Sequence, residues 1–442
     1  MPNPRRSRLA AALGAALLLA MPLAGAADEA QLDAIAGETA ELRELPPLAE
    51  IDDVFITSDE LKARLPELIA EDYPPEEAAA DDRAYAALGL LPEGTDLLAR
   101  YLDLLGEQVA GYFDPITDEM VVLGGDGDLD LGPVEEFTYA HETVHALQDA
   151  HLGLDAITES LIDRNDDEAT AIAALIEGDA TVASLDYLAA NPQLAAGIAF
   201  GGAPPSPVLD AAPGPLVVWL VFPYAAGPEF VAALRAEGGW AAVDAAYADL
   251  PRSTEQILHP EKYLAERDDP TPVSLPDLAP VLGAGWQLVD EDTLGELTVA
   301  LLLADLGPGQ GIDPFSGTLA LPEAARNAAA GWDGDRYALW ADGDEEALVW
   351  RSTWDSEDDA RAFSRALALR TQARFGGSLT AADPDAVTLE TPEATTRIVR
   401  AGPDVLYLQT PSPAVADAVQ GALEAGPSAR ATPGGTPEAT PR

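Results

Sequence analysis

The chain of 442 residues contains no cysteine. It therefore has no disulfide bonds, no thiolate nucleophile and no cysteine-ligated metal, so any metal site must use histidine and carboxylate side chains. Histidine is also scarce, because the chain has four, and they are His141, His145, His151 and His259. The choice of imidazole ligands is therefore narrow from the outset.

Basic residues are few as well: 24 lysines and arginines stand against 77 acidic residues, which gives a net charge of −53 at pH 7. Recognition of nucleic-acid phosphates needs a basic surface, and docking on anionic lipids needs lysine and arginine clusters. We therefore predict no nucleic-acid partner and no membrane partner beyond the N-terminal segment. Hydrophobic residues make up 48% of the chain, which is enough for folded cores.

Both ends of the chain differ from the rest. Three arginines precede an apolar run at residues 9–21, and the small residues 24–26 follow as a cleavage pattern. This order predicts a bacterial signal peptide over residues 1–26 and a secreted or extracytoplasmic protein; an uncleaved membrane anchor is the alternative. The tail, residues 426–442, is rich in proline, threonine and glycine and is predicted to be disordered.

The pattern after the signal peptide predicts a mainly helical unit over residues 28–267. Its first part, residues 28–105, has apolar residues at helical spacing and could serve as a propeptide. Two β-rich runs, Ala110–Phe113 and Met120–Leu123, flank a turn and predict a hairpin. Residues 192–215 are rich in proline, glycine and alanine, and we expect a loop or lid there. The apolar run that follows fits a buried strand or a core helix.

A stretch rich in proline and aspartate at residues 268–280 is the predicted linker to a second unit over residues 281–425. In this unit two pairs of strands are each followed by a helix. This ββαββα order predicts a smaller α+β domain with its helices on one face of a sheet, and an α+β fold class for the chain. The predicted strands are 336–341, 347–354, 396–400 and 405–409, and the predicted helices are 356–373 and 413–423.

Residues 141–145 read His-Glu-Thr-Val-His within a predicted helix over residues 133–148. Residues four apart on an α-helix lie about 40° apart around the axis and about 6 Å along it, so His141 and His145 can meet one metal ion. Glu142 points to one side, where it can reach a metal-bound water. This is the HExxH pattern of zinc hydrolases. The alternative is a pair of structural histidines with an incidental glutamate.

The third metal ligand decides the subclass. His151 has the spacing of the metzincin motif, but that motif needs a glycine to turn the chain where this sequence has Gln148. The metzincin methionine turn is also impossible, because every methionine precedes the motif. On a straight helix His151 would lie about 15 Å along the axis from His141. His151 is therefore a weaker candidate.

Glu177 is the favoured third ligand, because it lies in a second predicted helix, over residues 166–187. Two antiparallel helices can direct two imidazoles and one carboxylate at a common point and leave a coordination position open for water. Small residues follow Glu177, as expected where helices approach closely. The rival ligands are Glu168, Asp179 and His151.

The HETVH sequence followed by Glu177-Gly178-Asp179-Ala180 resembles the gluzincin zinc metallopeptidases, whose third ligand is a glutamate on a downstream helix. The resemblance spans roughly residues 108–190. It implies a zincin-like domain in which the hairpin at 110–123 is the counterpart of the substrate-lining edge strand. It also implies that Zn²⁺ is the cofactor, and that His141, His145 and Glu177 are its ligands and Glu142 is the catalytic base. An insertion at about 151–166 must be assumed.

Zinc peptidases also need a hydrogen-bond donor for the tetrahedral oxyanion. His259 or Tyr263 is our candidate, because the stretch at 253–263 brings together a histidine, a lysine and a tyrosine. The alternative there is a helix cap at Ser253 or Thr254 with a packed histidine. The segment Tyr112–Asp114 is a weaker candidate for lining the cleft.

The sequence thus predicts a secreted zinc-dependent metallohydrolase, foremost a peptidase acting on a peptide or protein substrate. An extended peptide can add as a strand to the hairpin edge. Two alternatives remain: a degenerate scaffold that binds without catalysis, and a zinc hydrolase of non-peptide bonds. The presence of Glu142 favours an enzyme, since a binding module needs no general base. The sequence makes no prediction of oligomeric state.

Overall fold

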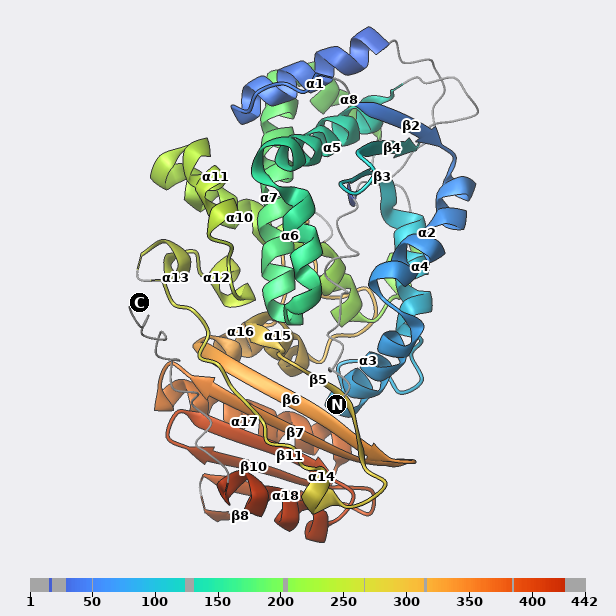
Figure 1. Ribbon diagram of the computed structural model, residues 1–442. Coiled ribbons are helices and arrows are strands. Elements are labelled where there is room, and N and C mark those ends of the chain that lie inside the picture. The colour runs from blue at the N-terminus through green and yellow to red at the C-terminus, as the bar shows by residue number, and fades with distance from the viewer. Residues whose placement is uncertain are drawn as a thin grey trace, which may run out of the picture.

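The computed structural model describes residues 16–17, 29–49, 51–123, 131–201, 206–265, 267–313, 316–383 and 385–425. The expected signal peptide, apart from residues 16–17, and the expected disordered tail lie outside the described residues. The predicted α+β class is confirmed. A mainly helical half carries a small sheet, and the other half is built on a seven-stranded sheet (Figure 1).

The described residues between 29 and 108 are mainly helical, in agreement with the prediction for residues 28–105, apart from one short strand, β2 (Asp52–Ile56). Their helix ends follow local chemistry. Thr57 and Glu60 form a reciprocal capping box, and Gly89 ends the third helix with φ +77°. The helices are α1 (Glu29–Arg43), α2 (Ser58–Asp72), α3 (Pro75–Leu88) and α4 (Leu97–Gln108).

The small sheet contains the predicted hairpin, formed by β3 (Val109–Asp114) and β4 (Glu119–Leu123). β2 pairs in parallel with β4, an arrangement that local sequence does not indicate. On the other side, β1 (Ala16–Leu17) pairs antiparallel with β3, so the order is β1-β3-β4-β2. β3 lies against the next helix, α5 (Pro133–Leu152).

Three long helices form the centre of the helical half: α5, α7 (Asp166–Ala190) and α10 (Gly214–Gly238). The two helices predicted over 133–148 and 166–187 are thus confirmed, and both are longer than predicted. The apolar run at 216–222 belongs to α10. This helix is long and apolar enough to cross a membrane, but 67% of its most apolar window is buried inside the fold, as in a core helix.

The prediction of a loop or lid at 192–215 is wrong for the part that is described. α8 (Pro192–Gly201) and α9 (Pro207–Ala211) occupy most of it, and α10 begins at Gly214. The prolines suggest a loop, but at the first position of a helix proline removes no intrahelical hydrogen bond and its φ is already helical. The short elements that complete this half are α6 (Leu154–Ser160), α11 (Trp240–Ala248), α12 (Thr254–Leu258) and α13 (Glu261–Leu264).

α7 and α10 cross with their backbones in contact. A Cβ atom on Gly178 would lie 2.4 Å from the carbonyl oxygen of Gly227, and one on Gly227 would lie 2.2 Å from that of Ala174. Real Cβ atoms do not approach other atoms this closely, so only glycine permits the crossing. Because Glu177 precedes Gly178, the crossing fixes the position of the predicted third ligand relative to α10.

The second half is built on an antiparallel sheet of seven strands (Figure 1). It contains the four predicted strands and three that were not predicted. In spatial order the strands are β5 (Gln287–Asp292), β6 (Trp332–Asp342), β7 (Glu345–Trp354), β11 (Asp404–Thr410), β10 (Thr395–Ala401), β9 (Ala386–Glu390) and β8 (Thr380–Asp383). Its helices are α14 (Ala279–Leu282), α15 (Gly295–Ala304), α16 (Glu323–Ala329), α17 (Glu357–Phe375) and α18 (Pro413–Ala425).

The prediction that the helices share one face of this sheet is wrong. Trp350 packs with Phe363 of α17, whereas its neighbour Val349 faces a separate cluster that contains Val419 of α18. The central strand β7 is apolar at both odd and even positions over residues 347–350, so both of its faces need cover.

The junction between the halves holds buried carboxylates. Asp167, at the start of α7, is 3% exposed, and its Oδ1 accepts hydrogen bonds from the hydroxyl of Thr254, at 2.5 Å, and from the backbone N–H of that residue. It packs so closely against Gly295 that a Cβ there would lie 1.7 Å from Oδ1. Burial raises the pKa of Asp167 to about 7, although these hydrogen bonds oppose the shift.

We expect stability to fall as the pH rises from about 4 to 7. Folded Asp167 keeps a proton that the unfolded chain loses near pH 4, so its contribution is complete below pH 4 and is lost as the pH passes its folded pKa. The shift corresponds to roughly 4 kcal/mol in the free energy of unfolding. Urea unfolding at pH 4, 5.5 and 7 should show a weaker pH dependence in Asp167→Asn. The exposed substitution Glu159→Gln should leave it unchanged, and an unchanged slope in Asp167→Asn would refute the assignment.

Candidate metal centre

The three favoured ligands meet at one buried point between α5 and α7. Oε2 of Glu177 lies 3.2 Å from Nε2 of His141 and 3.3 Å from Nε2 of His145. The two imidazole rings lie edge to face with their centroids 5.0 Å apart. The histidines are 3% exposed and Glu177 is 1% exposed. This group can hold a metal ion, because one donor atom of each residue lies within 4.8 Å of the others.

The hydrogen bonding of the cluster fits a cation. Nε2 of His145 and Oε1 of Glu177 are buried without a hydrogen-bond partner among the described residues. Burial disfavours the charged imidazolium of His145, but the carboxylates of Glu177 and Glu142 outweigh this and raise its pKa to about 9. Burial likewise opposes ionisation of Glu177, yet the two histidines lower its pKa to about 2. The cluster therefore stabilises positive charge at its centre.

Glu142 lies between the cluster and the hairpin. It is fully buried, and its Oε2 accepts a hydrogen bond of 2.9 Å from the backbone N–H of Phe113 in β3. Its Oε1 has no hydrogen-bond partner among the described residues. Burial raises its pKa, and the neighbouring histidines oppose that rise. One carboxylate oxygen is thus fixed by the strand, while the other is left to accept a proton.

The rival ligands are engaged elsewhere. His151 donates to the carbonyl oxygen of Pro46 at 2.8 Å, and Glu168 forms an ion pair with Arg164. Asp179 faces Arg43 at 2.6 Å. None of the three belongs to the metal-ligand group that the described residues form.

Tyr224 of α10 lies beside the cluster and was not predicted. Its ring centroid is 6.2 Å from that of His141, and the two planes are inclined by 32°. It stands three residues before Gly227, so the crossing of α7 and α10 carries it to the site. The sequence gives no local signal for this placement, because Tyr224 sits in an apolar helix between two prolines, Pro223 and Pro228.

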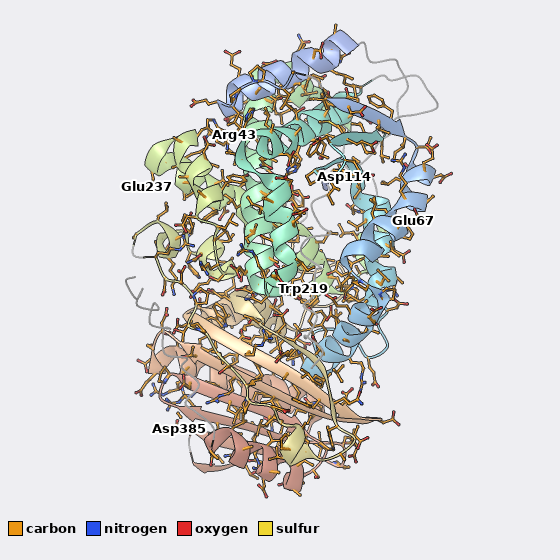
Figure 2. The ribbon with its side chains drawn as sticks, viewed as in Figure 1. Arg43, Glu67, Asp114, Trp219, Glu237 and Asp385 are labelled. Atoms are coloured by element: carbon orange, nitrogen blue, oxygen red, sulfur yellow. The ribbon has the colours of Figure 1, made fainter. Side chains whose placement is uncertain are left out.

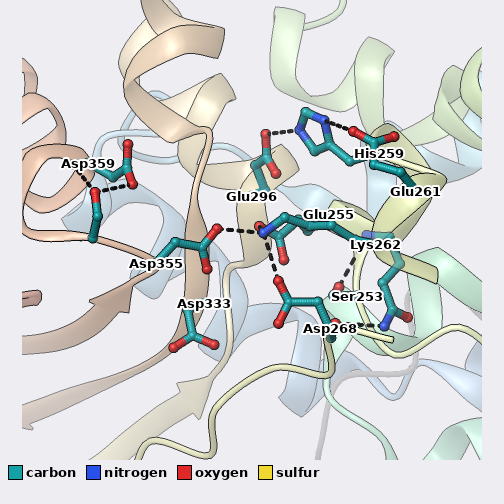
Figure 3. A network of polar contacts seen from close by, with 12 residues as sticks. Ser253, Glu255, His259, Glu261, Lys262, Asp268, Glu296, Asp333, Asp355 and Asp359 are labelled. Atoms are coloured by element: carbon teal, nitrogen blue, oxygen red, sulfur yellow. Dashed lines mark hydrogen bonds and ion pairs between the residues drawn. The ribbon is translucent and has the colours of Figure 1, made fainter. Parts of the chain in front are cut away.

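The structure does not bring His259 and Tyr263 to the metal ligands. Nε2 of His259 lies 3.0 Å from Oε1 of Glu296 (Figure 3). The hydroxyl of Tyr263 donates to the carbonyl oxygen of Asp249. The helix preceding His259 starts at Thr254, which bonds Asp167. Asp167 lies ten positions before Glu177 on α7, which is about 15 Å along the helix axis. The helix cap of the alternative is present, since Ser253 Oγ accepts from the N–H of Gln256. The histidine is not fully packed, because its side chain is 34% exposed.

A second group of acids, at residues 268, 333 and 355, also has the spacing of metal ligands. Lys262 already supplies a cation there: its Nζ lies 2.9 Å from Asp268 and 2.6 Å from both Asp355 and Glu255 (Figure 3). These contacts join α12, the chain segment after it and the end of β7. The group is therefore an ion-pair cluster that ties the two halves together.

Comparison with known proteins adds one match, which lies in the second half. A domain of unknown function, DUF8575, matches residues 285–420, which cover all seven strands of the large sheet, α15 to α17 and part of α18. No curated protein and no solved structure matches the chain.

Proposed function

We propose that the protein is a secreted zinc-dependent metallohydrolase of the gluzincin type that cleaves peptide bonds. The convergence of His141, His145 and Glu177, with Glu142 directly beside them, carries this proposal. Two imidazoles and one carboxylate on facing helices are a ligand set of catalytic zinc sites, in which the fourth position is left for water or substrate. A zincin-like assignment of the helical half is part of the proposal.

The chemistry follows from the positions of the side chains. Zn²⁺, when bound, lowers the pKa of a water molecule and polarises the scissile carbonyl. Nε2 of each histidine and Oε2 of Glu177 would hold it. Oε1 of Glu142 takes a proton from the attacking water and passes it to the leaving amine. The N–H of Phe113 keeps the other oxygen of Glu142 in place through both transfers.

The hairpin supports a peptide as the substrate. The edge of β3 accepts an added strand, because residues 16–17 pair antiparallel with it opposite Gly111 and Val109. A Cβ atom on Gly111 would lie 3.7 Å from Cγ of Glu142, so this edge runs beside the general base. A substrate bound in the same way gains main-chain hydrogen bonds that are independent of its sequence.

Removal of metal should abolish hydrolysis. We expect the mature protein to contain one zinc ion per chain by elemental analysis and to cleave an unfolded protein substrate. Dialysis against a chelator should stop cleavage, and one equivalent of Zn²⁺ should restore it. The His151→Ala variant, altered outside the ligand set, should behave like the wild type. Cleavage that survives complete metal removal would contradict the proposal, and bound zinc without any hydrolysis would favour the scaffold alternative.

Tyr224, rather than His259 or Tyr263, is our candidate donor to the oxyanion. This assignment is based on the position of its ring, whose centroid lies 6.2 Å from that of His141. Tyr224→Phe should lower kcat about 100-fold with little change in KM, as loss of one oxyanion donor does in other hydrolases. Tyr263→Phe is the matched control and should keep wild-type kcat. If steady-state kinetics instead showed a loss of kcat in Tyr263→Phe and wild-type kcat in Tyr224→Phe, Tyr263 would again be the candidate donor.

A further inference from the structure

Gln148 holds the ring of His145 through Nδ1, the nitrogen that does not face Glu177. Its Oε1 lies 2.8 Å from Nδ1 of His145. Its Nε2 donates to two acceptors, the carbonyl oxygen of Ile176 at 3.0 Å and Oδ2 of Asp179 at 3.1 Å. Because both of these partners can only accept hydrogen bonds, the NH₂ group of Gln148 faces them and its carbonyl oxygen faces the imidazole. His145 therefore carries a proton on Nδ1, and its neutral form leaves Nε2 with a free lone pair toward Glu177.

Asp179 is in turn held rigidly. Both of its oxygens accept from Arg43, at 2.6 and 3.0 Å, and Oδ2 also accepts from the hydroxyl of Tyr247 at 2.8 Å. Asp179 and Arg43 are each 0% exposed. Such a bidentate, fully buried pair fixes the carboxylate in both position and orientation.

Arg43 is the last residue of α1 (labelled in Figure 2), and it is fully buried. Its guanidinium lies 4.3 Å from the ring centre of Trp240 and 2.7 Å from Asp244, both on α11. A continuous chain of contacts thus leads from α1 through Asp179 and Gln148 to a metal ligand.

We propose that Gln148, supported by Asp179 and Arg43, is a positioning residue that sets the tautomer and orientation of His145 for metal binding. This inference rests on the proposed metal centre and deepens it. It also assigns α1 to the mature protein, because removal of α1 as part of a propeptide would leave Asp179 without its buried cation. The sequence suggested that residues 28–105 could be a propeptide; the contact made by Arg43 opposes this.

The test is the affinity of full-length mature protein for Zn²⁺, measured by competition with a chromophoric chelator. Gln148→Met, which keeps the length of the side chain but cannot accept from Nδ1–H, should weaken zinc binding 10- to 100-fold. His151→Gln, on the next turn of α5, is the control and should bind zinc normally.

Nitrogen-15 NMR of histidine-labelled, zinc-loaded wild type supplies a readout that needs no variant. We expect a proton on Nδ1 of His145 and zinc on Nε2. The opposite assignment, or wild-type zinc affinity in a folded Gln148→Met, would overturn the proposal while leaving the hydrolase function intact. Tight zinc binding with the expected tautomer in a protein that cleaves nothing would refute the function and keep the positioning role.

Discussion

Glu142→Gln is expected to lower kcat for peptide cleavage about 1000-fold while the protein still binds one zinc ion. Glutamine has the same size, and its amide oxygen can still accept the hydrogen bond from the N–H of Phe113, so the local structure should persist. It cannot take a proton from water, and a general base contributes about 10² to 10⁴ in rate. Steady-state kinetics and elemental analysis of the same preparation measure both effects.

The matched control is Glu168→Gln on α7, which removes a carboxylate that is paired with Arg164 away from the ligands. This variant should keep wild-type kcat and zinc content. If Glu142→Gln kept substantial activity, the proposed general base would be wrong. If it instead lost its zinc, the residue would be part of the ligand set and the division of roles would have to change.

Gly227→Ala is expected to lower the free energy of unfolding strongly. The added Cβ would lie 2.2 Å from the carbonyl oxygen of Ala174 and 3.0 Å from Cα of Gly178. These are backbone atoms of a packed helix, so no side-chain rotation relieves the clash and α7 and α10 must move apart. Overpacking of this kind costs about 3 kcal/mol or more. Because Glu177 adjoins the crossing, we also expect weaker zinc binding.

Gly37→Ala in α1 is the control, since no heavy atom lies within 4 Å of its Cβ position. There alanine should be neutral or should stabilise the helix by about 0.5 to 1 kcal/mol. Urea unfolding at neutral pH compares the two variants. Equal stabilities would mean that the backbones of α7 and α10 do not touch as described.

The parts that the sequence predicted correctly depend on short-range patterns. The HExxH spacing places His141 and His145 on one helix face whatever surrounds them. Likewise the turn between β3 and β4 fixes a hairpin through neighbouring residues. The choice of Glu177 over its rivals needed one further step, namely the small residue that follows it and permits close helix packing.

The parts that the sequence missed depend on contacts between distant segments. Tyr224 reaches His141 only because two glycines, in α7 and α10, let the helices touch, and neither glycine is distinctive alone. His259 was misplaced for the converse reason. Its neighbourhood of a histidine, a lysine and a tyrosine suggested a reactive site, but its imidazole is paired with Glu296 at the junction of the two halves. The sequence likewise did not predict that helices cover both faces of the large sheet, because strand order and helix placement are set by tertiary packing.

The central claim is that one divalent cation is shared by three named atoms. A crystal structure of the zinc-loaded protein, with anomalous data collected at the zinc edge, tests it most directly. The account predicts one strong peak, with Nε2 of His141 and His145 about 2.0–2.1 Å away and an oxygen of Glu177 at about 2.0–2.2 Å. A peak at another place, or a zinc-loaded protein in which these three side chains hold no ion, would contradict it.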